Sequence, residues 1–197
     1  MAYSLPLQEI PETLGAVELT SIARGYLVAD AMVKRAPLRV LDARAYCPGK
    51  FLIVVSGDVA SVEEAVTLAA ETAGPSLFGS ILIPNLSPQV VGAINREIVL
   101  PDNPDAVETV GVVEAFSAVA LIDGADAAVK AAEVTLQSVN LLEGLGGKAF
   151  MILAGLLTDV QTAVEAARSR IPDDMFVETQ VIPQVTSDIV SFFPGRS

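Results

Sequence analysis

The chain repeats itself, and this duplication constrains its fold more than any other feature of the sequence. The matching segments keep the same order in both halves: Gly15–Glu18 with Gly111–Glu114, Ala29–Lys34 with Ala125–Lys130, and Gly49-Lys50 with Gly147-Lys148. The first two pairs are 96 residues apart and the third is 98 apart, so the second copy is longer in the segment before its Gly-Lys pair. Because a repeat is one structural unit used again, the sequence predicts two similar domains of about 85 residues in head-to-tail order.

Each unit has the hydrophobic pattern of a small domain that combines a sheet with helices. Alternating or apolar runs predict strands, and apolar residues at helical spacing predict helices. In the first unit we expect strands at Leu14–Leu19, Leu38–Tyr46, Phe51–Val55 and Ser80–Ile83, and helices at Ser21–Ala36 and Val59–Ala73. This β-α-β-β-α-β order predicts an α/β (α+β) fold of the ferredoxin-like type, in which an antiparallel sheet has helices on one face.

The duplication also sets the expected domain boundaries. We assign residues 1–96 to the first domain, 97–108 to a linker and 109–197 to the second domain with a C-terminal tail. Pro101, Asp102, Asn103 and Pro104 are typical of a linker. The tail after Pro183 has no repeat of the domain pattern, and we expect its phenylalanines, Phe192 and Phe193, to pack it down.

Composition excludes several classes of function. The net charge of −12 argues against nucleic-acid binding, which needs clustered Lys and Arg. The chain has no His, the residue used most often as general base and as transition-metal ligand, and it shows no cofactor fingerprint, so we predict that it is not an enzyme. The longest uncharged apolar run, Ala149–Leu157, is far shorter than the ~20 residues of a membrane-spanning helix.

The cysteine count and the hydropathy indicate the compartment and the assembly. A single cysteine, Cys47, allows no intrachain disulfide, which fits a reducing cytoplasm, and no secretory signal is expected. Hydrophobic residues make up 52% of the chain and charged residues only 18%, below the roughly 25% of average soluble domains. A chain with so little charge for its surface is expected to make extensive subunit contacts.

Both units resemble the bacterial microcompartment (BMC) shell domain. In the first unit the resemblance rests on Gly15–Gly25, Ala29–Lys34 and Pro48–Phe51. In the second unit it rests on Gly111–Glu114, Ala125–Ala127, Lys130 and Gly146–Lys148. Single-domain members of that family form flat hexamers that tile edge to edge, and tandem-domain members form trimers. The resemblance therefore implies a homotrimeric pseudo-hexamer that tiles a microcompartment shell together with other shell proteins.

The same resemblance implies roles for several residues. The lysine of the Asp-Ala-x-x-Lys segment lies at the tile edge in the family, which marks Lys34 and Lys130 as edge contacts. The family often has an arginine in a Pro-Arg-Pro-His segment after the last strand. This chain has Pro84-Asn85-Leu86 and Pro183-Gln184-Val185 instead, so an edge contact from that segment is not expected.

The loops at the tile axis differ between the two units. The expected pore-loop residues are Tyr46, Cys47, Pro48 and Gly49 in the first unit and Gly144, Leu145, Gly146 and Gly147 in the second. Tyr46–Leu52 and Gly144–Lys148 most resemble the propanediol-utilisation T-type group of tandem shell proteins, in which one Cys from each of three subunits ligates an iron–sulfur cluster. The resemblance thus implies that Cys47 holds a 4Fe–4S cluster, or a 3Fe–4S cluster, on the three-fold axis. Such a cluster would serve electron transfer across the shell or delivery to encapsulated redox enzymes.

Alternatives remain for these motifs. A lone Cys is more often a small hydrophobic residue than a ligand, and the tile axis could then be a metabolite pore without metal. Glu18 and Glu114 could form a carboxylate pair for acid–base work, but their repeat equivalence favours a shared structural role. The segment Gly144–Lys148 lacks the first glycine and the Ser/Thr of a phosphate loop, which favours a turn or pore loop.

Overall fold

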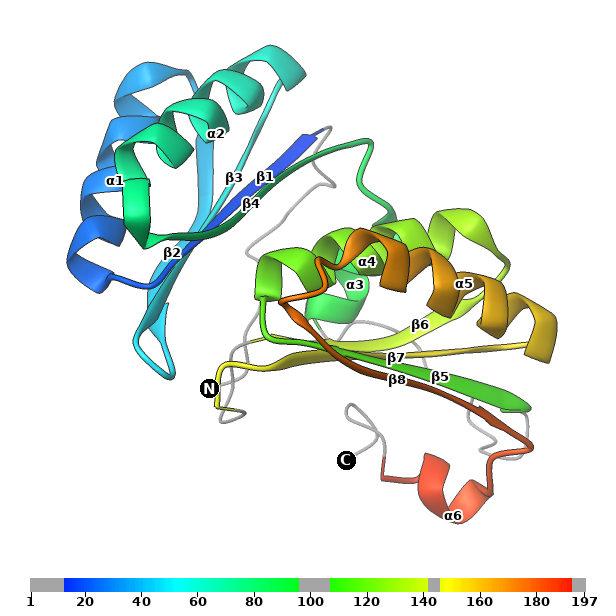
Figure 1. Cartoon of the computed structure of the whole chain (residues 1–197). Coiled ribbons are helices and arrows are strands. Elements are labelled where there is room, and N and C mark those ends of the chain that lie inside the picture. Colours follow the sequence, from blue (N-terminus) through cyan, green and yellow to red (C-terminus); the bar gives the residue numbers. More distant parts are fainter. Residues whose placement is uncertain (1–12, 96–106, 142–145, 193–197) are drawn as a thin grey trace.

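Two domains of the same topology lie side by side in the computed structural model (Figure 1). The structure describes residues 13–95, 107–141 and 146–192. Most of the expected linker, residues 97–106, falls outside these ranges. Among the helices in the described ranges, all are too short or too polar to cross a bilayer.

The first domain is a four-stranded antiparallel sheet with two helices on one face. Its strands are β1 (Thr13–Leu19), β2 (Arg39–Tyr46), β3 (Lys50–Gly57) and β4 (Leu77–Pro84), and its helices are α1 (Ile22–Arg35) and α2 (Val59–Ala73). A 3₁₀ turn, η1 (Gly74–Ser76), separates α2 from β4. The spatial order is β2-β3-β1-β4, and every pair of neighbours is antiparallel.

The second domain repeats this arrangement element by element. It consists of β5 (Thr109–Ala115), α4 (Ala118–Ala131), β6 (Thr135–Asn140), β7 (Ala149–Gly155), α5 (Leu157–Arg170) and β8 (Phe176–Pro183), with strand order β6-β7-β5-β8. The two domains also share a register shift at the same place. β1 shifts against β4 after Glu18, and β5 shifts against β8 after Glu114. The predicted α/β fold with the ferredoxin-like order is confirmed.

Serine caps start the first helix of each domain. The hydroxyl of Ser21 accepts a hydrogen bond from the Arg24 amide, and that of Ser117 accepts one from the Ala120 amide, as N-caps do. Asp58 caps α2, and the hydrogen bonds from the Ser61 hydroxyl and amide lower the pKa of its carboxyl below the ordinary value. Helix α1 therefore begins within one residue of the predicted start at Ser21.

Two short helices follow the last strands and were not expected from the hydrophobic pattern. Helix α3 (Pro88–Asn95) leaves its own domain and packs against β6 and α4 of the second. Its Gln89 side chain accepts from the Leu136 amide and donates to the Val134 carbonyl, which satisfies backbone groups on the outer strand of that sheet. Helix α6 (Ser187–Val190) instead stays beneath its own sheet (Figure 1).

The expectation for the C-terminal tail is wrong for the residue that can be placed. Phe192 is 84% exposed, so it does not pack the tail down. Val190 does so instead, because it is fully buried in a cluster with Val110 and Ile152 on the sheet face opposite the helices. Phe193 lies outside the described residues.

The register locates the two extra residues of the second copy. Arg44 pairs with Leu52 in the first sheet, and Asn140 pairs with Phe150 in the second. Arg44 and Asn140 are thus equivalent at an offset of 96, whereas Leu52 and Phe150 are equivalent at 98. The additional residues therefore belong to the β6–β7 loop and leave the strands in register.

The contact between the first helix and the facing strand uses side chains of reversed size in the two domains. In the first domain Gly25 of α1 faces Phe51 of β3 so closely that an added Cβ would lie 2.3 Å from Phe51 Cγ. The equivalent positions in the second domain hold Leu121 on the helix and Ala149 on the strand, both buried. A small helix residue with a large strand residue has been exchanged for the opposite pair at nearly conserved volume.

This reversal gives a test of the repeat alignment. Gly25→Leu should destabilise the protein by about 3 kcal/mol or more through overpacking, and Phe51→Ala by about 3–5 kcal/mol through cavity formation. The double variant recreates the pair used by the second domain, so it should recover at least half of the summed loss in chemical denaturation. A double variant no more stable than additivity predicts would contradict the alignment.

Candidate functional site: the domain interface and the adjoining loops

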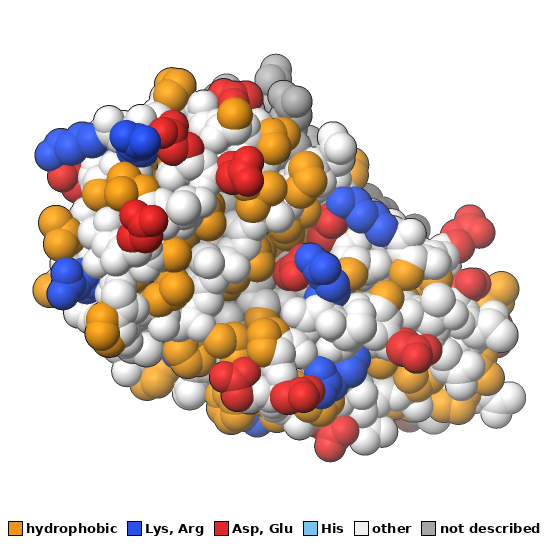
Figure 2. Space-filling view, turned by 45° about the horizontal axis from the view of Figure 1, so that its top comes forward, with side chains coloured by type: hydrophobic (Ala, Val, Ile, Leu, Met, Phe, Trp, Pro, Cys, Tyr) orange, Lys and Arg blue, Asp and Glu red, His pale blue; other side chains and the backbone are white. Residues whose placement is uncertain are grey.

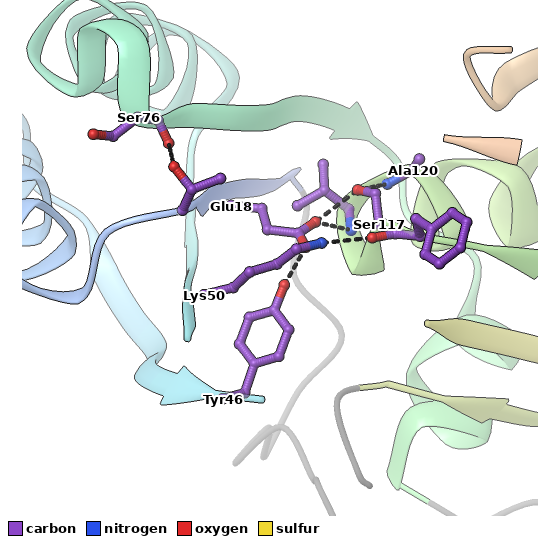
Figure 3. A network of polar contacts seen from close by, with 9 residues as sticks. Glu18, Tyr46, Lys50, Ser76, Ser117 and Ala120 are labelled. Carbon is purple, nitrogen blue, oxygen red and sulfur yellow. Dashed lines mark hydrogen bonds and ion pairs between the residues drawn. The ribbon is translucent and has the colours of Figure 1, made fainter. Parts of the chain in front are cut away.

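A buried carboxylate of the first domain joins the two domains. Glu18 lies on β1 and is 0% exposed. One carboxylate oxygen, Oε1, accepts from Lys50 Nζ at 2.9 Å and from the Tyr46 hydroxyl. The other, Oε2, accepts from the Ser117 hydroxyl at 2.6 Å and from the Val119 amide at 3.3 Å (Figure 3). The carboxylate therefore bridges β2 and β3 of one domain to the start of α4 in the other.

The lysine partner makes a second link across the boundary. Lys50 Nζ donates to the Phe116 carbonyl at 2.6 Å, directly before the Ser117 cap (Figure 3). The same ammonium lies 3.5 Å from the centre of the Phe78 ring, which adds a cation–π contact. Because Lys50 binds both Glu18 and Phe116, the ion pair fixes the position of one domain against the other.

The surroundings suit the charges that the interface buries. Removing a carboxylate and an ammonium from water is costly unless they pair and gain further hydrogen bonds. Glu18 has four donors, and it faces the N-terminus of α4, where the helix dipole and free amides favour negative charge. The pair is therefore specific to this docked arrangement of the domains.

The repeat-equivalent pair of the second domain is placed differently. Lys148 Nζ lies 3.3 Å from Glu114 Oε2, but the two side chains are 42% and 34% exposed. Each glutamate thus pairs with the lysine of its own domain, the shared structural role that repeat equivalence favours. Gly49-Lys50 and Gly147-Lys148 are visible in the sequence as a repeat, but we did not predict that these lysines pair with the glutamates. The available signal was that the lysine recurs in both units, as the glutamate does.

The expected axial loops of the two domains lie next to each other. Tyr46 ends β2 and turns its hydroxyl to Glu18, while Cys47 is exposed at the turn and precedes a cis peptide bond to Pro48. Gly49 has a φ of +100° and Gly147 one of +89°, which favour glycine. A Cβ on Gly147 would lie 2.8 Å from Pro48 Cδ, so the loops of the two domains are in contact.

The remaining residues of the expected site divide into placed and unplaced positions. Gly146 sits in the same turn as Gly147 with a φ of +63°, whereas Gly144 and Leu145 lie outside the described residues. Lys34 forms an exposed ion pair with Asp30 at 2.6 Å, and Lys130 pairs with Asp126 at 2.5 Å. Asp126 is buried, and its other oxygen accepts a hydrogen bond from the Ser87 amide of the first domain.

The described residues of one chain do not supply a metal site by themselves. Across the described ranges, His, Cys, Asp and Glu nowhere gather in a group of three that could hold a metal ion. A cavity of about 310 Å³ beside β6 and β7 is lined in part by Glu108, Glu133 and Asp159, and these carboxylates form no such group either. Cys47, exposed at its turn, could ligate a cluster only together with thiols from other chains.

Comparisons with known proteins agree with the fold and the repeat. The model of the BMC domain matches twice, at residues 13–86 and 109–185. The bacterial microcompartment shell protein PduT of Citrobacter freundii is 40% identical over 174 residues, which cover 88% of this chain and 92% of that protein. A crystal structure of a microcompartment protein from Desulfitobacterium hafniense superposes with a TM-score of 0.72 at 36% identity, covering 91% of this chain and 98% of that one.

A more distant structure shares the fold alone. The fused permuted hexameric shell protein of the RMM microcompartment superposes with a TM-score of 0.57 at 22% identity, covering 80% of each chain.

The buried pair at the domain interface yields a prediction. Glu18→Gln should lower the free energy of unfolding by about 3 kcal/mol, because it leaves the Lys50 ammonium buried without its counter-charge. Adding Lys50→Met should recover much of this loss, as seen in a double-mutant cycle by denaturant unfolding. The control is Lys34→Met, whose exposed ion pair with Asp30 should contribute less than about 1 kcal/mol. Equal losses for Glu18→Gln and Lys34→Met would contradict a special role for the interface pair.

Proposed function

The chain belongs to the BMC-domain family of bacterial microcompartment shell proteins, and from this premise we propose that three copies form a pseudo-hexameric tile with an iron–sulfur cluster on its axis. Its place is the microcompartment shell, and its role there is structural rather than catalytic. Assembly with itself and with other shell proteins follows from that role.

The proposed stoichiometry rests on the two domains per chain. A six-domain tile needs three chains when each chain supplies two domains that already lie side by side (Figure 1). The apolar composition supports extensive contacts between copies. In such a tile, Lys34 and Lys130 are proposed to face neighbouring tiles, with their acidic partners Asp30 and Asp126 keeping the ammonium groups in place.

The observation that supports the axial site is the contact between the two loops. Pro48 and Gly147 belong to equivalent turns of the two domains and touch each other. A ring that continued this pairing through three chains would gather six such turns around its centre. Only the turn of the first domain contains a thiol, so the ring would present three Cys47 side chains and not six.

Three thiolates fit the demand of an iron–sulfur cluster. Cubane clusters are held by cysteine thiolates, and three of them can ligate three corners of a 4Fe–4S or the irons of a 3Fe–4S cluster. Cys47 is exposed at a turn with proline and glycine beside it, which leaves its sulfur accessible to a ligand shared between chains. When bound, the cluster would supply one-electron chemistry, either to move electrons across the shell or to deliver a cluster to encapsulated redox enzymes.

The assembly is tested by the mass of the particle in solution. Light scattering coupled to size-exclusion chromatography should give the mass of three 20.5-kDa chains, with no substantial monomer at micromolar concentration. A monomer would contradict the tile, because a tile has no function as a single chain.

The cluster is tested on anaerobically purified protein. Iron and acid-labile sulfide should reach about one cluster per trimer, and Cys47→Ser should abolish both while the trimer persists. Ala45→Ser is the matched control, since it changes an exposed residue of the same hairpin and keeps the thiol. A wild-type trimer without iron after anaerobic reconstitution would contradict the cluster and favour a metabolite pore lined by Cys47.

A further inference from the structure

The two first helices of the repeat differ sharply in how much of their surface is covered. Ile22 and Tyr26 of α1 are 40% and 63% exposed, whereas their equivalents on α4, Ala118 and Ile122, are each 1% exposed. Helix α4 is covered because β1, β4 and α3 of the first domain pack against it. Helix α1 has exposed apolar side chains on the lobe formed by the first domain, where Figure 2 shows apolar groups among charged ones.

The Glu–Lys side of the domain contact also has an exposed copy, which lies on the second domain. Within the chain, Glu18 and Lys50 bind the start of α4 through Phe116, Ser117 and Val119. Their equivalents, Glu114 and Lys148, pair with each other and remain partly exposed. The chain therefore has an open copy of each side of its own domain interface: a Glu–Lys pair on the second domain, and a capped helix start on the first.

A second anchor repeats in the same way. Asp126 of α4 accepts a hydrogen bond from the Ser87 amide, just after the turn at Asn85. Asn85 and Gln184 occupy equivalent turns with φ of 52° and 50°, so Thr186 is the equivalent of Ser87. Asp30 is the equivalent of Asp126. Its side chain is exposed and forms an ion pair with Lys34. Asp30 therefore lies on α1, the helix whose start is open, and Thr186 lies on the second domain, which also carries the open Glu–Lys pair.

We propose that the Glu114–Lys148 pair of one copy docks on the start of α1 in the next copy, in the manner that Glu18 and Lys50 dock on α4. By the repeat equivalence, Lys148 donates to the Thr20 carbonyl, and Glu114 accepts from the Ser21 hydroxyl and the Ala23 amide. The contact is head-to-tail, so each copy uses one side of it for each neighbour, and such contacts form a ring when the rotation closes. This inference rests on the proposed trimer and assigns the residues that close it.

The contact between copies is expected to be weaker than the contact within a chain. Phe78, whose ring covers Lys50, is replaced at the equivalent position by Val177, which has no ring to offer Lys148. Lys148 instead lies 5.9 Å from the ring of Phe116 in its own domain. Glu178 stands opposite Glu114 on β8, where the first domain has Gly79, and adds a second negative charge at this end of the sheet.

Charge reversal across the contact provides the test. Ala23→Glu puts a carboxylate in the first turn of α1, which suits the helix of the free chain but faces Glu114 and Glu178 of the neighbour. Glu114→Lys puts a second ammonium beside Lys148, facing the helix start of the neighbour. Each single variant should weaken association by roughly 30-fold or more per contact in sedimentation velocity, as for like charges in a buried interface. The double variant pairs the new Glu with the new Lys between copies and should recover the trimer.

The control variant is Thr67→Glu on α2, because Thr67 and its equivalent Glu165 are both exposed. It should leave association unchanged, and circular dichroism should show that all variants are folded. Single variants that associate like a trimeric wild type, or a double variant weaker than either single one, would overturn this assignment and leave the trimer standing. A monomeric wild type would instead overturn the proposed tile.

Discussion

The buried ion pair of Glu18 and Lys50 is the interaction on which the arrangement of this protein depends. Its carboxylate is fully buried and has four donors, two from its own domain and two from the start of α4. Charges this far from water are stable only where every hydrogen bond is in place, so the pair tolerates one docked position of the domains. That position also brings Pro48 and Gly147 together and thereby aligns the two turns proposed for the tile axis.

Duplication has produced one motif in two environments. The Glu–Lys pair and the serine-capped helix occur in both domains. Within the chain, the pair of the first domain binds the capped helix start of the second domain, whereas Glu114 and Lys148 pair with each other. The other combination remains on the surface, together with the exposed apolar side chains of α1. The open Glu–Lys pair and the open helix start lie on different domains. One copy can therefore offer each of them to a different neighbour, and the same contact can repeat from copy to copy.

Much of the fold could be predicted because it depends on short-range patterns. Strand alternation and helical spacing placed the elements of the first unit within a few residues, and the predicted family is confirmed. Helices α3 and α6 could not be predicted in this way, since α3 is stabilised by packing on β6 of the other domain and α6 by the burial of Val190 beneath its sheet. The lysine partners of the glutamates were visible as a repeat, but their pairing depends on the β1–β3 register.

The sequence by itself determined the duplication, the domain topology, the family and the single thiol, since these follow from residue order and from local hydrophobic periods. Only the tertiary structure decided which Glu–Lys pair is buried, that the turns of the two domains touch, and which face of α1 is left uncovered. The physical reason is that both repeats carry the same Glu, Lys and capping Ser at this contact. Their difference arises from which domain packs against which, and that is a property of long-range contacts that neither repeat encodes alone.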